Sequence, residues 1–169
     1  PLRHRHIYFA HAFKGQSGWQ ELLLRFRHGG GTLYDLEYLV DEDGRRVAAF
    51  GHWAGFAGAA VASMAWCGQQ SSELSELASL TAYSDKGALI ESCRRQLNTC
   101  SSTPKVMVIG SAGRCGAGAT ELFRELGVEL TLWDLEETRA GGPFEEILEH
   151  DVLVNCVFVS KLIPPFLTH

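Results

Sequence analysis

Apolar and polar positions in the second half of the chain predict strands that alternate with a helix. Residues 105–109 form an apolar run rich in β-branched side chains, and a helical pattern begins at Ala119. Two further apolar runs, at residues 128–133 and 151–159, predict a second and a third strand. Strands that alternate with helices are typical of a parallel sheet, so this pattern predicts an α/β fold.

A glycine cluster lies between the first of these strands and the helix. Gly110 lets the chain reverse, Gly113 leaves room for a pyrophosphate, and Gly116 lets the helix pack closely on the strand. The helix N-terminus then offers N–H groups and a partial positive charge to phosphate groups. The spacing G-x-x-G-x-x-G is one residue longer than the usual dinucleotide-binding motif, so the glycines alone are a weak signal.

An acidic residue, Asp134, stands at the end of the second predicted strand. It lies close to the expected distance of about 20 residues past the glycines. A carboxylate there accepts hydrogen bonds from the adenosine ribose hydroxyls and repels a 2′-phosphate, which favours NAD over NADP. The alternative is an α/β domain whose glycine turn binds nothing. Because strand, glycines, helix, strand and acid occur in order, the sequence favours a Rossmann-like parallel sheet that binds NAD.

The first part of the chain carries a second, shorter α/β pattern. Residues 4–13 contain a short apolar strand, which we expect to be buried, with His11 at its C-terminal end. A helix that begins at Ser17 or Gly18 follows it, and the glycines of residues 29–31 end this helix. Ligands of open α/β sheets bind at the C-terminal ends of strands, so His11 is a candidate functional residue.

A hairpin and two helices are predicted between these two regions. Residues 32–39 and 45–50 predict two strands that are joined by a turn at residues 41–44. Small apolar residues at 51–66 predict a helix packed closely on a neighbour, and residues 86–97 predict an amphipathic helix.

We expect the chain to divide into three parts. Residues 1–50 would be the end of a catalytic domain, and residues 51–103 would be connecting helices with a Ser-rich linker. Residues 104–169 would be the beginning of an NAD-binding domain. Within the connection, residues 68–80 are polar and predict a surface segment with at most one short helix.

Composition excludes several classes of protein. The chain has 169 residues, and its 46% hydrophobic and 21% charged content is ordinary for a soluble globular protein. A net charge of −5 without a block of Lys or Arg argues against nucleic acid as a partner. No apolar run reaches about 18 residues, which argues against a membrane partner.

Five cysteines are widely spaced along the chain, and no secretory leader is recognised. This favours a cytoplasmic protein with mostly free thiols, and no Cys and His spacing suits a metal. Cys115 lies in the first strand–helix turn, and Cys156 lies towards the end of the third predicted strand. Because adjacent parallel strands end at the same edge, we expect the two sulfurs to lie close enough to interact.

Eight motifs spread over most of the chain resemble the NAD-dependent, lysine-forming saccharopine dehydrogenases of fungal lysine biosynthesis. The resemblance implies a two-domain α/β oxidoreductase with a cleft between a catalytic and an NAD domain. It implies the reversible conversion of saccharopine, NAD and water to L-lysine, 2-oxoglutarate and NADH, and we expect a monomeric full-length protein. The motifs are residues 9–20, 31–37, 44–51, 54–60, 113–119, 133–138, 141–147 and 155–161.

The resemblance also assigns roles to individual residues. His11 would be one acid–base residue, and an imidazole with a pKa of about 6.5 suits that role. The implied saccharopine contacts are Gln16, Arg46 and Phe50, of which the Arg46 guanidinium suits a substrate carboxylate. The implied NAD contacts are Arg45, Gly113, Arg114, Asp134, Thr138 and Phe158, where the family carries tyrosine at the last position.

The chain departs from the family pattern at one catalytic position. The family's second acid–base residue is a lysine before the histidine segment, and Lys14 does not match it. The chain also begins without Met and stops soon after the third strand, so we expect an internal piece of a longer enzyme. A truncated, non-catalytic nucleotide-binding protein and an amino-acid dehydrogenase of the alanine dehydrogenase type are the alternatives.

Overall fold

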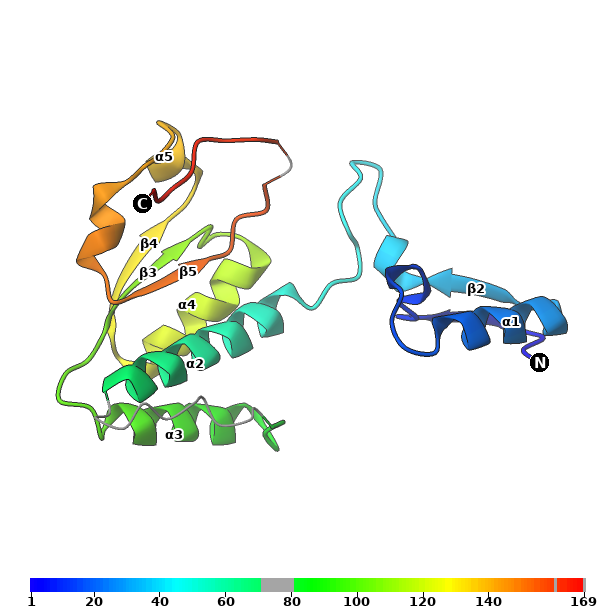
Figure 1. Cartoon of the computed structure of the whole chain (residues 1–169), viewed down its shortest axis with the longest axis horizontal. Coiled ribbons are helices and arrows are strands. Elements are labelled where there is room, and N and C mark those ends of the chain that lie inside the picture. Colours follow the sequence, from blue (N-terminus) through cyan, green and yellow to red (C-terminus); the bar gives the residue numbers. More distant parts are fainter. Residues whose placement is uncertain (71–80, 160, 169) are drawn as a thin grey trace. The chain divides into compact units, whose positions relative to one another are not determined.

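The computed structural model describes residues 1–70, 81–159 and 161–168, which form two compact units, Pro1–Phe50 and Gly51–His169 (Figure 1). Each unit is an α/β structure with a small parallel sheet, so the predicted fold class of an incomplete Rossmann-like protein is confirmed. The assignment of residues 1–50, 51–103 and 104–169 to catalytic, connecting and NAD-binding parts stays a prediction. Residues 71–80 of the predicted surface connection lie outside the described residues.

The first unit is a strand–helix–strand arrangement. Strands β1 (Arg5–Tyr8) and β2 (Thr32–Asp35) pair in parallel, with α1 (Trp19–Gly29) between them along the chain. The helix ends at Gly30, whose φ of 71° is left-handed and whose N–H donates to the Phe26 carbonyl, as the glycines predict. Two 3₁₀ helices, η1 (Ala12–Lys14) and η2 (Leu36–Tyr38), follow the two strands.

Two expectations for the first unit are wrong. The strand before His11 is not buried, because Ile7 is 68% exposed on a sheet of only two strands. The predicted hairpin is reduced to one antiparallel bridge between Val40 and Arg46. The Asp41 carboxylate accepts hydrogen bonds from the Asp43 and Arg45 N–H groups, so the turn forms but the return strand does not.

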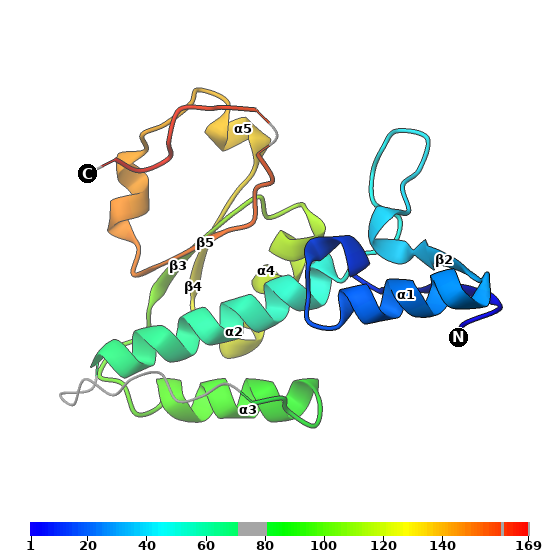
Figure 2. The ribbon, with the colours of Figure 1, turned by 45° about the vertical axis from the view of Figure 1, so that its right-hand side comes forward.

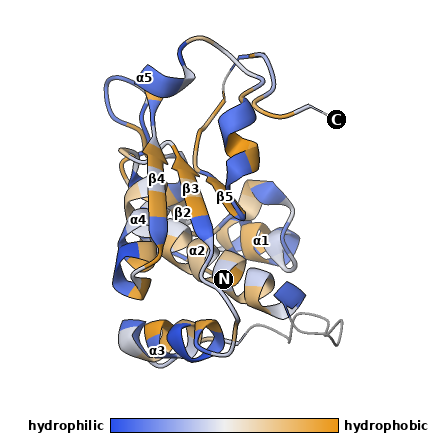
Figure 3. Cartoon of the chain, turned by 90° about the vertical axis from the view of Figure 1, so that its left-hand side faces the viewer, coloured by the Kyte–Doolittle hydropathy of each residue, from blue (hydrophilic) through white to orange (hydrophobic). Residues whose placement is uncertain are grey.

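The second unit has a three-stranded parallel sheet in the order β4-β3-β5. Strand β3 (Lys105–Ile109) is central, with β4 (Glu129–Trp133) on one side and β5 (Val152–Asn155) on the other. Apolar residues fill the middle of these strands (Figure 3). Along the chain, β4 is added on one side of β3 and β5 on the other, so the order of the strands switches sides at β3. Ligands of open α/β sheets bind at the carboxyl ends of the strands beside such a switch point.

Helices α2 (Gly51–Gln70) and α4 (Arg114–Leu126) lie side by side on one face of this sheet, and α3 (Lys86–Leu97) packs on α2 (Figures 1 and 2). Val106 and Val108 of β3 join the core under these helices. Met107 and Ile109 point to the opposite face, where Ile147 of η3 (Glu145–Glu149) covers them. Among the helices of residues 1–70, 81–159 and 161–168, none combines the length and apolarity needed to cross a membrane.

The ends of two elements in the second unit differ from the prediction. Helix α4 begins at Arg114 instead of Ala119, because the Ala117 N–H already donates to the Gly113 carbonyl. Strand β5 ends at Asn155 instead of continuing to residue 159, because the Asn155 side chain accepts a hydrogen bond from the Val157 N–H. The helix predicted at residues 86–97 has the predicted ends.

Candidate functional site

The glycine turn after β3 has the geometry that its sequence predicts. Gly110 adopts a left-handed φ of 80°, which reverses the chain, and its N–H donates to the Trp133 carbonyl. A β-carbon on Gly116 would lie 2.6 Å from the Cα of Ser111, so glycine is needed where α4 approaches the strand end. Gly113 caps the N-terminus of α4 without a side-chain hydrogen bond. Its contact with a pyrophosphate stays a prediction.

Asp134 follows β4 directly and lies beside this turn. One of its carboxylate oxygens, Oδ2, accepts a hydrogen bond of 2.8 Å from the Ala112 N–H, and Oδ1 accepts one of 2.9 Å from the Leu135 N–H. Asp134 is also the N-cap of the short helix α5 (Leu135–Thr138). The structure therefore places the predicted ribose-binding acid at the carboxyl end of the sheet, next to the glycine turn.

Asp134 forms a capping box with Glu137, which sequence reasoning missed. The Glu137 carboxylate accepts a hydrogen bond of 2.7 Å from the Asp134 N–H, and the Thr138 hydroxyl donates to the Asp134 carbonyl at 2.8 Å. An acid three residues after an N-cap Asp is a recognised signature of a helix start, so the sequence did contain this signal.

A cavity of about 520 Å³ opens beside α5 and the segment after β5. Thr138 and Phe158, two of the predicted cofactor contacts, line it together with Leu135 and Arg139. Phe158 is 91% exposed, so its ring is available for stacking. The apolar walls, the uncapped α4 N-terminus and the nearby Asp134 fit the adenosine and phosphate parts of a dinucleotide.

Two predicted cofactor residues carry less structural evidence. Arg114 is the first residue of α4, at the helix end where phosphate binding is predicted. Arg45 lies in the first unit, where its N–H donates to Asp41. The roles of both residues in NAD binding stay predictions.

In the first unit, a charged cluster surrounds the predicted acid–base residue. Lys14 Nζ and Arg46 Nη2 donate hydrogen bonds of 2.6 Å and 2.7 Å to the Glu37 carboxylate, and His11 Nδ1 lies 3.5 Å from it. The hydrogen bond from Lys14, helped by the charge of Arg46, holds the pKa of Glu37 below its usual value against the opposing effect of burial. Glu37 therefore stays ionised at neutral pH.

His11 itself has an unusual backbone conformation. Its φ of 49° lies in the left-handed region, where a non-glycine residue costs about 1 kcal/mol or more. The ring stacks on Phe9 at 5.9 Å between centroids, and Phe9 contacts Phe50 at 4.6 Å. Three predicted residues, His11, Arg46 and Phe50, are thus brought together.

The structure does not bring the fourth predicted residue into this cluster. Gln16 is exposed in the turn before α1, where its carbonyl accepts the Trp19 N–H. Sequence reasoning also missed Glu37 and Lys14 as members of the cluster. Their contacts join positions 23 residues apart, which local pattern analysis does not detect.

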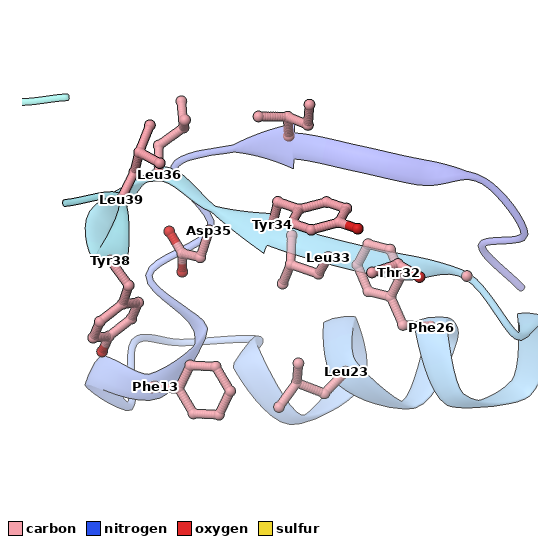
Figure 4. Close-up of a pocket in the computed structure, with 12 residues that line it drawn as sticks. Phe13, Leu23, Phe26, Thr32, Leu33, Tyr34, Asp35, Leu36, Tyr38 and Leu39 are labelled. Carbon is pink, nitrogen blue, oxygen red and sulfur yellow. The ribbon is translucent and has the colours of Figure 1, made fainter. Parts of the chain in front are cut away.

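A cavity of the first unit lies between β2 and α1 (Figure 4). Its volume is about 1110 Å³, and none of the predicted site residues lines it. Leu23 and Phe26 extend into it from α1, opposite Leu33 of β2. Its lining is mostly apolar, so we interpret it as an incompletely filled core beside a sheet of two strands.

The two thiols of the predicted pair, Cys115 and Cys156, are both free. Burial raises the pKa of Cys156, and the charge of Cys115 raises it further, so the two sulfurs lie within electrostatic reach. A direct contact between them stays a prediction.

Comparison with known proteins gives the same family along the entire chain. A saccharopine dehydrogenase [NAD(+), L-lysine-forming] of Yarrowia lipolytica is 47% identical, over 100% of this chain and 48% of its own length. Proteins of the same name from Candida albicans and Candida glabrata are 44% and 46% identical, over 99% and 100% of this chain. No family model matches the chain. The chain spans about half the length of the curated relatives it matches, and the predicted resemblance is confirmed.

Proposed function

We propose that this chain, which is homologous over its whole length to lysine-forming saccharopine dehydrogenases, carries the histidine and cofactor parts of such an enzyme. The reaction would be the reversible conversion of saccharopine, NAD⁺ and water to L-lysine, 2-oxoglutarate, NADH and a proton. The observation that carries the proposal is the 47% identity to a relative of that name over 100% of the chain.

The charged cluster supports a proton-transfer role for His11. An ionised Glu37 beside Nδ1 favours the tautomer that carries its proton there, which leaves Nε2 to exchange a proton with the substrate. Arg46 lies on the same carboxylate, and its fork of N–H donors suits a carboxylate of the substrate. Phe50, packed on Phe9 beside His11, would supply an apolar contact.

The glycine turn and Asp134 support NAD as the cofactor. NAD, when bound, would accept the hydride from the substrate carbon that bears the secondary amine. Gly113 and the α4 N-terminus would hold the pyrophosphate, and Asp134 would accept hydrogen bonds from the adenosine ribose. Thr138, Arg139 and Phe158 would line the adenine end, in the cavity of about 520 Å³.

Dinucleotide binding without turnover is the second candidate for the chain acting alone. Two observations favour it. The chain spans about half the length of its relatives, and Lys14, the lysine beside His11, is held by Glu37. A second proton-transfer group would then have to come from elsewhere in a longer protein.

Cofactor binding is tested by titrating the 169-residue chain with NADH and following its fluorescence. Asp134→Ala removes the ribose acceptor, and loss of hydrogen bonds to a charged group costs about 1.5–3 kcal/mol, or about 10-fold to 100-fold in Kd. Glu129→Gln is the matched control, because Glu129 lies at the other end of the same strand. A wild-type chain that folds without binding NADH contradicts the proposal.

Activity is tested in a chimera, in which this chain replaces the matching half of the Yarrowia lipolytica relative. We expect NADH oxidation that depends on lysine and 2-oxoglutarate, and about 10²-fold to 10⁴-fold less of it in His11→Asn. His28→Asn, near the end of α1, is the control and should keep full activity. A folded chimera that binds NADH but keeps its rate in His11→Asn contradicts the role of His11.

A further inference from the structure

The capping box at the end of β4 holds a second acidic side chain, that of Glu137, against Asp134 of the proposed cofactor site. The geometry points to Glu137 as a second determinant of cofactor choice, whose negative charge excludes the 2′-phosphate of NADP from the ribose position at Asp134. This inference rests on the proposed dinucleotide site and adds to it a residue that selects between two cofactors.

Both carboxylates are held by backbone N–H groups, at the start of α5 and in the glycine turn after β3. The Glu137 carboxylate accepts from the Asp134 N–H at 2.7 Å, while the Asp134 carboxylate accepts from the Leu135 and Ala112 N–H groups. Neither side chain needs to reorganise to present its charge to the ribose. A 2′-phosphate carries about two negative charges at neutral pH, so it would meet two fixed charges of the same sign.

Asp134 alone leaves the selection incomplete, because the proposed dinucleotide site also contains cations. Arg139 and Lys161 line the cavity beside α5, and Arg114 begins α4. Guanidinium and ammonium groups attract a phosphate, and NADP-binding sites of this fold use such an arginine. The charge of Glu137 counters these cations at the one point where the two cofactors differ.

Two substitutions separate charge from structure. Glu137→Gln removes the charge but keeps the capping box, because glutamine at this position also accepts the hydrogen bond from the N-cap N–H. Glu136→Gln is the matched control. It removes the same charge from the adjacent, exposed residue, which makes no such hydrogen bond in the described structure.

The experiment measures the Kd of NADH and of NADPH for the 169-residue chain by fluorescence titration. We expect Glu137→Gln to lower the ratio of the NADPH Kd to the NADH Kd by about 3-fold to 10-fold, the range of partly screened charges. Glu136→Gln should leave this ratio unchanged within 2-fold. Asp134→Asn combined with Glu137→Gln should lower the ratio further than Asp134→Asn alone, and added salt should reduce every difference.

Each outcome decides the matter. Equal ratios of the NADPH Kd to the NADH Kd in Glu137→Gln and Glu136→Gln overturn the inference. A Glu137→Gln variant that binds NADH and NADPH more weakly by the same factor also overturns it, because Glu137 then acts only on the structure of the helix turn. Either result leaves the proposed NADH site standing if the wild-type chain binds NADH. A folded wild-type chain that binds neither cofactor overturns both the site and the inference.

Discussion

Two glycines, Gly118 of α4 and Gly55 of α2, lie where these two helices approach each other most closely, and Gly55 gives the sharper test. This residue is buried, and a β-carbon added to it would lie 2.6 Å from the carbonyl carbon and 2.8 Å from the Cα of Cys115. Both atoms belong to the backbone of α4, so no side chain can rotate away to make room. We therefore predict that Gly55→Ala destabilises the second unit.

The size of the effect follows from these distances. Carbon atoms in contact lie about 3.5–4.0 Å apart, and the Cys115 carbonyl oxygen would lie nearer to the added β-carbon than either carbon, so the two helices would have to separate by more than about 1 Å. Overpacking of this kind costs about 1–3 kcal/mol, and the better helix propensity of alanine returns about 1 kcal/mol. Gly58→Ala is the matched control, because Gly58 lies on the same helix with nothing within 4 Å of its added β-carbon. It should gain about 0.5–1 kcal/mol.

Urea denaturation followed by far-UV circular dichroism measures both free energies of unfolding. We expect Gly55→Ala to be less stable than Gly58→Ala by about 1–3 kcal/mol, because the helix propensity of alanine is gained in both variants, with equal m-values in the two. Equal stabilities, or a Gly55→Ala variant more stable than wild type, would refute the close packing of α2 on α4.

Three further predictions concern other parts of the chain. The pKa of Glu37 lies below its usual value of 4.5, so its pairing stabilises the first unit above that pH. The stabilisation is lost as the pH falls through the folded pKa. Glu37→Gln should therefore reduce the dependence of the melting temperature on pH between about pH 5 and pH 3. Gly116→Ala should lower the unfolding free energy by about 1–3 kcal/mol and weaken NADH binding, because α4 is pushed from Ser111. Burial raises the pKa of Cys67 to about 12 and that of Cys93 to about 11. Iodoacetamide at neutral pH should therefore modify them only after denaturation, as mass spectrometry of digests would show.

Local sequence patterns located the elements whose causes are local. The helix at residues 86–97 was predicted with both ends, and Asp85 caps it through a hydrogen bond from the Ala88 N–H. Strand β3 and Asp134 were predicted because an apolar run and an acid at a strand end are visible in the chain itself. The start of α4 was missed because glycines normally disfavour a helix, whereas Gly116 and Gly118 are required there by close neighbours.

Features that depend on distant residues were not predictable in the same way. The left-handed conformation of His11 and its approach to Glu37 arise from contacts across 26 positions of the chain. The predicted return strand after residue 44 does not form because the Asp41 carboxylate accepts the hydrogen bond of the Arg45 N–H. Family resemblance supplied His11 and Arg46, but not the carboxylate that joins them.

The two units differ in how completely their cores are formed, and this difference bears on function. In the second unit, β3 has a strand on each side and is covered on both faces, so the glycine turn and Asp134 are held by a packed core. In the first unit, the sheet has two strands and lies beside a cavity of about 1110 Å³. The position of His11 therefore depends on a less constrained framework than that of Asp134. Because rigid support is what holds a catalytic group in place, we expect cofactor binding to tolerate isolation of this chain better than proton transfer does.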